Sequence, residues 1–266
     1  MIATTRATFF DGWGHPLFAL AMIGLGAIGL YSGDFASVWQ HMPIENMPGR
    51  SFLAYLAAII ELLAGIAILF RPTIALASRV LLVFLSLWLV ALKIPGVVTA
   101  PLVEAMWLGF GEIAVMVAGA WIIVATHSGR NGSRFLTGPT GVRNARILFA
   151  IALPMIGLSH FVYVDETMKF VPAWIPAPQF WAYLTGAGSL LACLGILSGV
   201  FARLAAALEA AMLVIITPLV WTPWLTPAPV NQFQLTGFLI SSAIACGAWI
   251  VADSYRARAW LGRTTV

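Results

Sequence analysis

Eight long apolar runs constrain this chain more than any other feature of its sequence. A transmembrane helix needs about 20 predominantly apolar residues, and each run is close to that length. The runs cover residues 16–32, 51–70, 73–92, 107–125, 147–164, 180–199, 204–222 and 235–252. Because 61% of the 266 residues are hydrophobic and only 9% are charged, the remaining loops are too short for an independent soluble domain. The sequence therefore predicts an all-α membrane protein with eight transmembrane helices.

The distribution of positive charge predicts how the chain is oriented. If the N-terminus is cytoplasmic, eleven of the 14 Lys and Arg residues lie at cytoplasmic helix ends, and only Arg50, Lys93 and Lys169 lie outside. Because cytoplasmic loops carry an excess of Lys and Arg, we expect both termini on the cytoplasmic side of a bacterial cytoplasmic membrane. The first run lacks an A-x-A-like cleavage site, so we expect a retained span. Trp39 and five other tryptophans near outer helix ends are expected to form an aromatic belt.

The two halves of the chain resemble each other in sequence. A shift of 128 residues aligns residues 52–56 with 180–184, and residues 119–122 with 247–250. No gap is needed between these matches, and positions 52–122 contain 21 identities among 71. This similarity exceeds what a shared apolar composition produces, so the sequence predicts a tandem duplication.

The duplication predicts the domain organisation. Each half holds four helices, an even number, so both halves insert the same way round and are expected to be related by an axis along the membrane normal. We expect two four-helix bundles side by side, formed by residues 1–126 and 147–266, the second with a basic C-terminal tail. Residues 127–146 are Gly-rich and basic, which predicts a cytoplasmic linker.

Parts of both halves resemble the DoxX-like family of integral membrane proteins. Residues 55–70, YLAAIIELLAGIAILF, are similar to the second DoxX helix, in which a Glu precedes a run of small residues and leucines. Residues 170–186 and 190–206 resemble the family's Pro-containing outer loop, helix, Gly and Arg turn and next helix. The resemblance implies a four-helix DoxX-like unit, here doubled. Ser189 aligns with Glu61, so the family Glu is expected in one half only.

The resemblance implies a membrane role and does not name a reaction. Members of the family are linked to quinone or thiosulfate oxidation, to thiol and oxidative-stress complexes, and to membrane cargo handling. Glu61 lies near the centre of its predicted helix, where an ionised carboxylate costs about 2.5–3.5 kcal/mol. It is therefore expected to be protonated or partnered. It is either a proton acceptor or hydrogen-bonding group for a quinone or other polar headgroup, or a neutral structural residue.

Further polar residues are expected near the outer helix ends. Glu112 lies about 8 Å below the outer end of its helix, at 1.5 Å per residue, where it could face Lys93 or His160. With these residues, other acidic side chains would form a polar vestibule, which is typical of a binding site. They are Asp34, Glu104 and Asp165. The alternative is that these helix-end side chains reach the lipid headgroups.

A second polar pair is predicted between the halves. Arg79 and Glu209 lie at similar depths on the third and seventh helices, which suggests a salt bridge. No metal site is predicted, because no two of the four histidines have ligand spacing. Cys193 and Cys246 lie in apolar runs and are expected to be buried fillers.

Three functions are compatible with the sequence. The first is an accessory or binding subunit of a quinone- or thiol-linked membrane redox system, without a redox centre of its own but with quinone as a possible ligand. The second is a transporter or carrier of a small or lipid-like molecule at the interface between the repeats. The third is a scaffold for other membrane proteins. Expected partners are the lipid bilayer and a membrane oxidoreductase or other membrane protein. The net charge of +4 does not indicate nucleic-acid binding.

Overall fold

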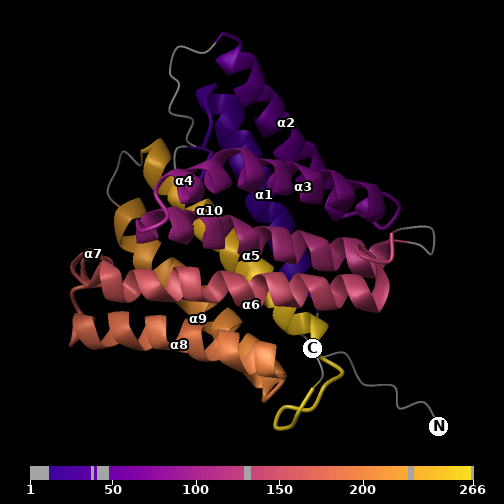
Figure 1. Ribbon diagram of the computed structural model, residues 1–266. Helices are drawn as coiled ribbons and strands as arrows, with labels where there is room; N and C mark the ends of the chain where they lie inside the picture. Colours follow the sequence, from indigo (N-terminus) through magenta and orange to yellow (C-terminus); the bar gives the residue numbers. More distant parts are fainter. Residues whose placement is uncertain (1–11, 37–38, 41–47, 129–132, 227–230, 265–266) are drawn as a thin grey trace, which may run out of the picture.

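The computed structural model describes residues 12–36, 39–40, 48–128, 133–226 and 231–264, and within them it is helical (Figure 1). Arg6 and Arg130, which contribute to the predicted charge bias, lie outside these ranges. The long helices are α1 (Gly14–Ser32), α2 (Arg50–Ile68), α3 (Ile74–Trp88), α5 (Glu104–His127), α6 (Gly138–Val162), α8 (Pro178–Ser198), α9 (Ala202–Leu225) and α10 (Gln232–Ser254). Two short helices, α4 (Ile94–Thr99) and α7 (Val164–Lys169), follow α3 and α6. Eight helical segments of the described chain are long and apolar enough to cross a membrane, which confirms the predicted all-α membrane protein.

The third span is not a regular α-helix throughout. A π-helical segment, η1 (Leu89–Lys93), separates α3 from α4, and the three form one continuous candidate span of 26 residues. In the other half α9 contains Pro218 and Pro223, and the 128-residue shift places Pro218 at position 90, within η1. Both segments depart from a regular α-helical ladder here, since a π-turn widens it and a proline has no N–H to donate.

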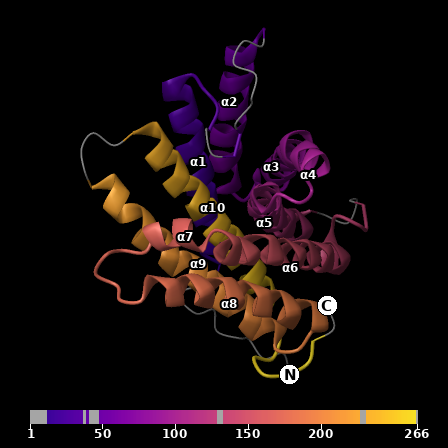
Figure 2. The same cartoon turned by 60° about the vertical axis from the view of Figure 1, so that its left-hand side comes forward.

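The two halves pack against each other through their first and last helices. Along the chain α1 packs on α2, α2 on α3 and α3 on α5, and in the second half α6 packs on α8, α8 on α9 and α9 on α10. The last helix of each half, however, packs against the first helix of the other: α5 lies on α6, and α10 lies on α1. Figures 1 and 2 show α5, α6 and α8 side by side, with α1 and α10 running across them at a steep angle. Two separate bundles are therefore not confirmed.

The centre of the molecule is the contact between α5 and α10. A Cβ atom built on Gly119 would lie 2.7 Å from the Cα atom of Gly247, and one on Gly247 would lie 3.0 Å from the carbonyl oxygen of Val115. Only glycine permits the two backbones to approach this closely. Gly119 and Gly247 are equivalent under the 128-residue shift, as expected for two repeats meeting at their symmetry axis, although the duplication itself stays a prediction.

Charged side chains tie the end of α10 to the rest of the fold. The guanidinium of Arg146, on α6, lies 3.7 Å from the centre of the Tyr255 ring. Its Nε donates a hydrogen bond to the Ser254 hydroxyl over 2.8 Å, and Nη2 donates to the Ser254 carbonyl. The following tail returns to the α8–α9 turn, where the Thr264 amide donates to the carbonyl of Gly199.

Candidate functional site

Glu61, the carboxyl group singled out in the sequence, is buried near the middle of α2. Its side chain is 2% exposed, and its Oε1 accepts a hydrogen bond of 2.6 Å from the Gln40 side chain. Gln40 follows α1 in the chain and is also buried. A turn holds it in place, because its amide donates to the Ala36 carbonyl and its own Oε1 accepts from the Ala36 amide. Gln40, which lies outside the helices, thus gives the mid-span carboxyl group an uncharged hydrogen-bond partner.

A narrow polar cavity extends from Glu61 toward the end of the molecule where α2 and α10 begin, which we call the outer side in keeping with the predicted orientation. Asp34, Gln40, Gln232 and Thr236 supply polar side chains to its lining. Its volume for a water-sized occupant is about 10 Å³, which is room for about one water molecule. The Thr236 hydroxyl is buried in this wall and has no hydrogen-bond partner within the described residues.

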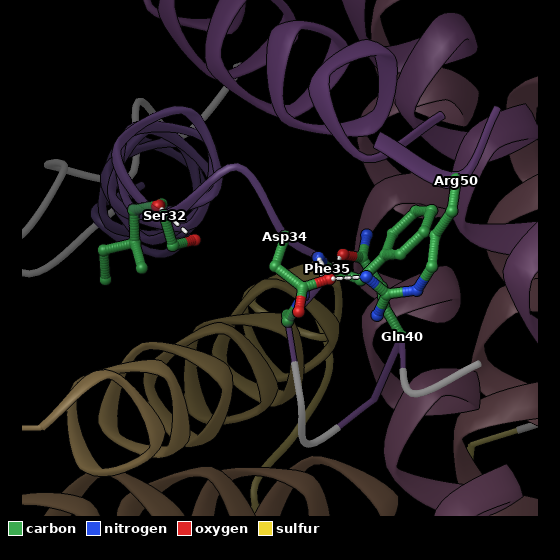
Figure 3. Close-up of polar contacts among 7 residues, drawn as sticks. Ser32, Asp34, Phe35, Gln40 and Arg50 are labelled. Atoms are coloured by element: carbon green, nitrogen blue, oxygen red, sulfur yellow. Dashed lines mark hydrogen bonds and ion pairs between the residues drawn. The ribbon is translucent and has the colours of Figure 1, made fainter. Parts of the chain in front are cut away.

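An ion pair lies beside the outer end of this region. Arg50, at the start of α2, contacts Asp34 over 2.7 Å, and its guanidinium lies 5.6 Å from the centre of the Phe35 ring. Asp34 also accepts a hydrogen bond of 2.7 Å from the Phe35 amide. Figure 3 shows Arg50 reaching toward Asp34 beside the Phe35 ring, with Gln40 close by.

Trp39 corrects one sequence prediction. It is 1% exposed and packs edge-on against Phe84 and Trp88 of α3, so it is part of the core and not of an aromatic belt. In the sequence, Trp39 lies near the outer end of a predicted helix, which suggested a position at the membrane surface. Phe35, Trp39 and Gln40, which follow α1, instead lie in the protein interior, where irregular backbone is tolerated because protein surrounds it.

The second half has its own buried carboxyl group, contributed by a different helix. Glu209, on α9, is 2% exposed, and its Oε1 accepts a hydrogen bond of 2.9 Å from the hydroxyl of Ser189 on α8. Ser189 is the residue that aligns with Glu61. The second half thus lacks the family Glu at the aligned position, and the neighbouring helix supplies a carboxyl group beside it instead.

A larger groove lies between α8 and α9 beside Glu209. Its volume is about 300 Å³, at the lower end of the range for small-molecule sites. Its wall is apolar apart from Glu209 and includes Gly188, Leu191, Ala192, Ala205, Leu208 and Met212. An apolar groove with one carboxyl in its wall suits a lipid-soluble molecule with a single polar end.

The predicted pair of Arg79 and Glu209 is not formed. Arg79 donates from Nε to the Ser128 hydroxyl over 3.2 Å, whereas Glu209 is bonded to Ser189. Their helices, α3 and α9, are not packed against each other. Equal depth along equivalent helices suggested a contact, but the α5–α10 pair occupies the space between them.

The predicted outer cluster divides into separate parts. Lys93 is close enough to Glu112 for an electrostatic interaction, as is Glu104. The two Glu104 carboxylate oxygens are buried without a hydrogen-bond partner within the described residues. His160 instead lies against α8, where Nδ1 is 2.9 Å from the Thr185 hydroxyl.

Sequence reasoning did not find Gln40, Thr236 or the pairing of Ser189 with Glu209. The available signal was weak: a polar residue occupies the Glu61 position in the other half, with a second carboxyl on the next helix. Cys193 and Cys246 are free and buried, as expected. Within the described part of the chain, no group of three His, Cys, Asp or Glu side chains is placed to hold a metal ion.

These features define an integral membrane protein with eight candidate spans and a buried, hydrogen-bonded carboxyl group in each half. The family model that matches the chain is DoxX, over residues 141–222, which run from α6 to α9. The predicted DoxX likeness is thus confirmed for this segment, which contains Ser189, Glu209 and the whole groove. No match to the chain is found among curated proteins or among solved structures.

Proposed function

We propose that the protein is an accessory subunit of a membrane redox system and that it binds an isoprenoid quinone in the α8–α9 groove. The observation that carries this proposal is the apolar groove of about 300 Å³ with Glu209 in its wall. A quinone has a flat ring, carbonyl oxygens that accept hydrogen bonds, and a long apolar tail. The cavity beside Glu61, which has room for about one water molecule, is too small for such a ring.

The chemistry of Glu209 supports a carbonyl ligand. An ionised carboxylate inside a span is costly, and the hydrogen-bond partner of Glu209 is the uncharged Ser189, so we expect a protonated carboxyl. Ser189 donates to Oε1. The other oxygen, Oε2, is therefore available to carry the proton and donate it in a hydrogen bond to a quinone carbonyl.

The walls of the groove support a flat, apolar ligand. On α8, Gly188 and Ala192 line the groove opposite Ala205 and Met212 of α9. The small residues leave room between the helices, and the flexible Met212 side chain can change its conformation to fit a ligand. The groove also lies inside the DoxX-like segment. The DoxX resemblance implies a link to quinone or thiol systems, which is why we place the ligand in a redox context.

Quinone binding is tested with the purified full-length protein and a short-tailed quinone analogue. We expect wild-type protein to bind it, Glu209→Leu, which removes the hydrogen-bond donor, to bind about fivefold to tenfold more weakly, the value of one hydrogen bond of about 1 kcal/mol, and Gly188→Leu not to bind. Gly188 tolerates a side chain, because an added Cβ would lie 3.4 Å from the flexible Met212 side chain.

Glu166→Leu is the matched control, because Glu166 is an exposed carboxyl on α7 that pairs with Lys169. This variant should bind like wild type. Unchanged binding by Gly188→Leu would place the quinone elsewhere, and no binding by wild-type protein would overturn the proposal.

The accessory role has a separate test. We expect crosslinking in native membranes to link the protein to an oxidoreductase that reduces or oxidises quinones or thiols. A partner without redox activity would instead favour the scaffold function.

One observation favours the carrier as a second candidate. The third span of each half departs from regular α-helix at equivalent places, through η1 in one half and Pro218 in the other. Paired interruptions of this kind are common where transporters bind substrate. Movement of the quinone analogue between vesicle leaflets, dependent on the protein, would distinguish a carrier from a binding subunit.

A further inference from the structure

The cavity beside Glu61 connects residues of very different exposure. Gln232, at the first turn of α10, is exposed, and Asp34 is partly exposed, whereas Glu61 and Thr236 are 2% and 1% exposed. All four line the same cavity. A polar path thus runs from the outer surface to a carboxyl group in the middle of a span.

The opposite direction is closed by tight helix packing. A Cβ atom on Gly26 of α1 would lie 2.5 Å from the backbone nitrogen of Leu62, and one on Gly65 of α2 would lie 2.9 Å from the carbonyl oxygen of Ala19. Backbones this close leave no room for water between α1 and α2. The contact between α1 and α2 therefore gives Glu61 no approach from the opposite side.

The cavity also has the groups that a water molecule needs. A buried water typically makes about three hydrogen bonds to polar groups that otherwise lack partners. The Thr236 hydroxyl is buried and without a partner in the described structure. Glu61 uses Oε1 for Gln40, so its second oxygen is available. Among the described residues that line the cavity, the charged group besides Glu61 is Asp34, which pairs with Arg50 over 2.7 Å.

We propose that this cavity holds water and makes Glu61 a proton-exchange site open to the outer side. Water bonded to Thr236 passes protons between the outer surface and the Glu61 carboxyl, which returns a proton for each one it accepts. Glu61 lies where α1 and α2 of one half meet α10 of the other, so its protonation bears directly on the contact between halves. This inference is independent of quinone binding in the α8–α9 groove.

The test follows hydrogen–deuterium exchange of protonated carboxyl groups by infrared spectroscopy in vesicles. The band lost in Glu61→Gln identifies Glu61, and the band lost in Glu209→Gln serves as an internal reference. We expect Thr236→Val to slow exchange at Glu61 by about tenfold or more, because a bridging water is lost, and to leave Glu209 unchanged.

Two further variants complete the design. Thr217→Val makes the same change at a buried threonine of α9, outside the cavity lining, and should leave Glu61 exchange as in wild type. Gln232→Leu covers the exposed mouth without altering the core, and should also slow exchange at Glu61. Wild-type rates in both Thr236→Val and Gln232→Leu, or no protonated band assignable to Glu61, would overturn the proposal.

Discussion

At the scale of single residues, each of the two buried carboxyl groups accepts a hydrogen bond from an uncharged side chain, and the two side chains differ. Glu61 accepts from the Gln40 amide, and Glu209 accepts from the Ser189 hydroxyl. Glu61 could be predicted as a candidate site residue from the sequence, because an ionised group within a membrane span is costly. The roles of Gln40 and Ser189 could not be predicted, because a hydrogen-bond partner from another segment depends on how the chain folds around the carboxyl group.

A first prediction concerns the hydrogen bond between Gln40 and Glu61. Glu61→Gln keeps a carbonyl oxygen for Gln40, so we expect little change in the melting temperature. Glu61→Leu leaves the buried Gln40 amide without its acceptor, and should destabilise the protein by about 1–3 kcal/mol. Thermal melts in detergent measure both. Equal melting of the two variants would mean that the hydrogen bond contributes nothing to stability.

At the scale of secondary-structure elements, apolar runs predicted the spans well, because each helix must satisfy its backbone internally to cross a membrane. Three features were not predicted. The π-helix η1 has no clear sequence signal, the burial of Trp39 and Gln40 between α1 and α2 depends on contacts with other helices, and the crossing of α5 and α10 requires knowing which glycine faces which. The sequence shows Gly119 and Gly247 only as equivalent positions of the two predicted repeats, and does not show that they contact each other.

The helix crossing gives a second prediction. Gly119→Ala places a methyl group 2.7 Å from the Gly247 backbone, which has no flexible side chain to move aside. We expect a loss of about 1–3 kcal/mol of stability, as in overpacked cores. Gly188→Ala, the matched control, meets only the Met212 side chain at 3.4 Å and should melt like wild type. If the two alanine variants melt alike, the helices do not cross at Gly119.

At the scale of the whole molecule, the fold class followed from composition and hydropathy, while the arrangement of the two halves did not. The main helix contacts follow the repeat: α1 with α10 corresponds to α6 with α5, and the contacts between successive long helices in one half have counterparts in the other. A sequence reports that two halves are alike, but not whether each closes on itself or on its neighbour.

The orientation in the membrane gives a third prediction. In a background without Cys193 and Cys246, Glu166→Cys should react with a membrane-impermeant maleimide in intact cells. Ser133→Cys, in the loop before α6, should react only after the membrane is permeabilised. This result follows from the excess of Arg at one set of helix ends. Labelling of position 133 in intact cells would reverse the assigned sides.

The packing of α10 on α1 also affects how the protein is made. Helix α1 leaves the ribosome well before α10, the helix that covers it. Until then the face of α1 that will hold α10 is turned to lipid or to the insertion machinery, and Thr236 is not yet beside Glu61. The cavity can thus form only after α10 has been synthesised, and a chain truncated before residue 232 would lack one of its walls.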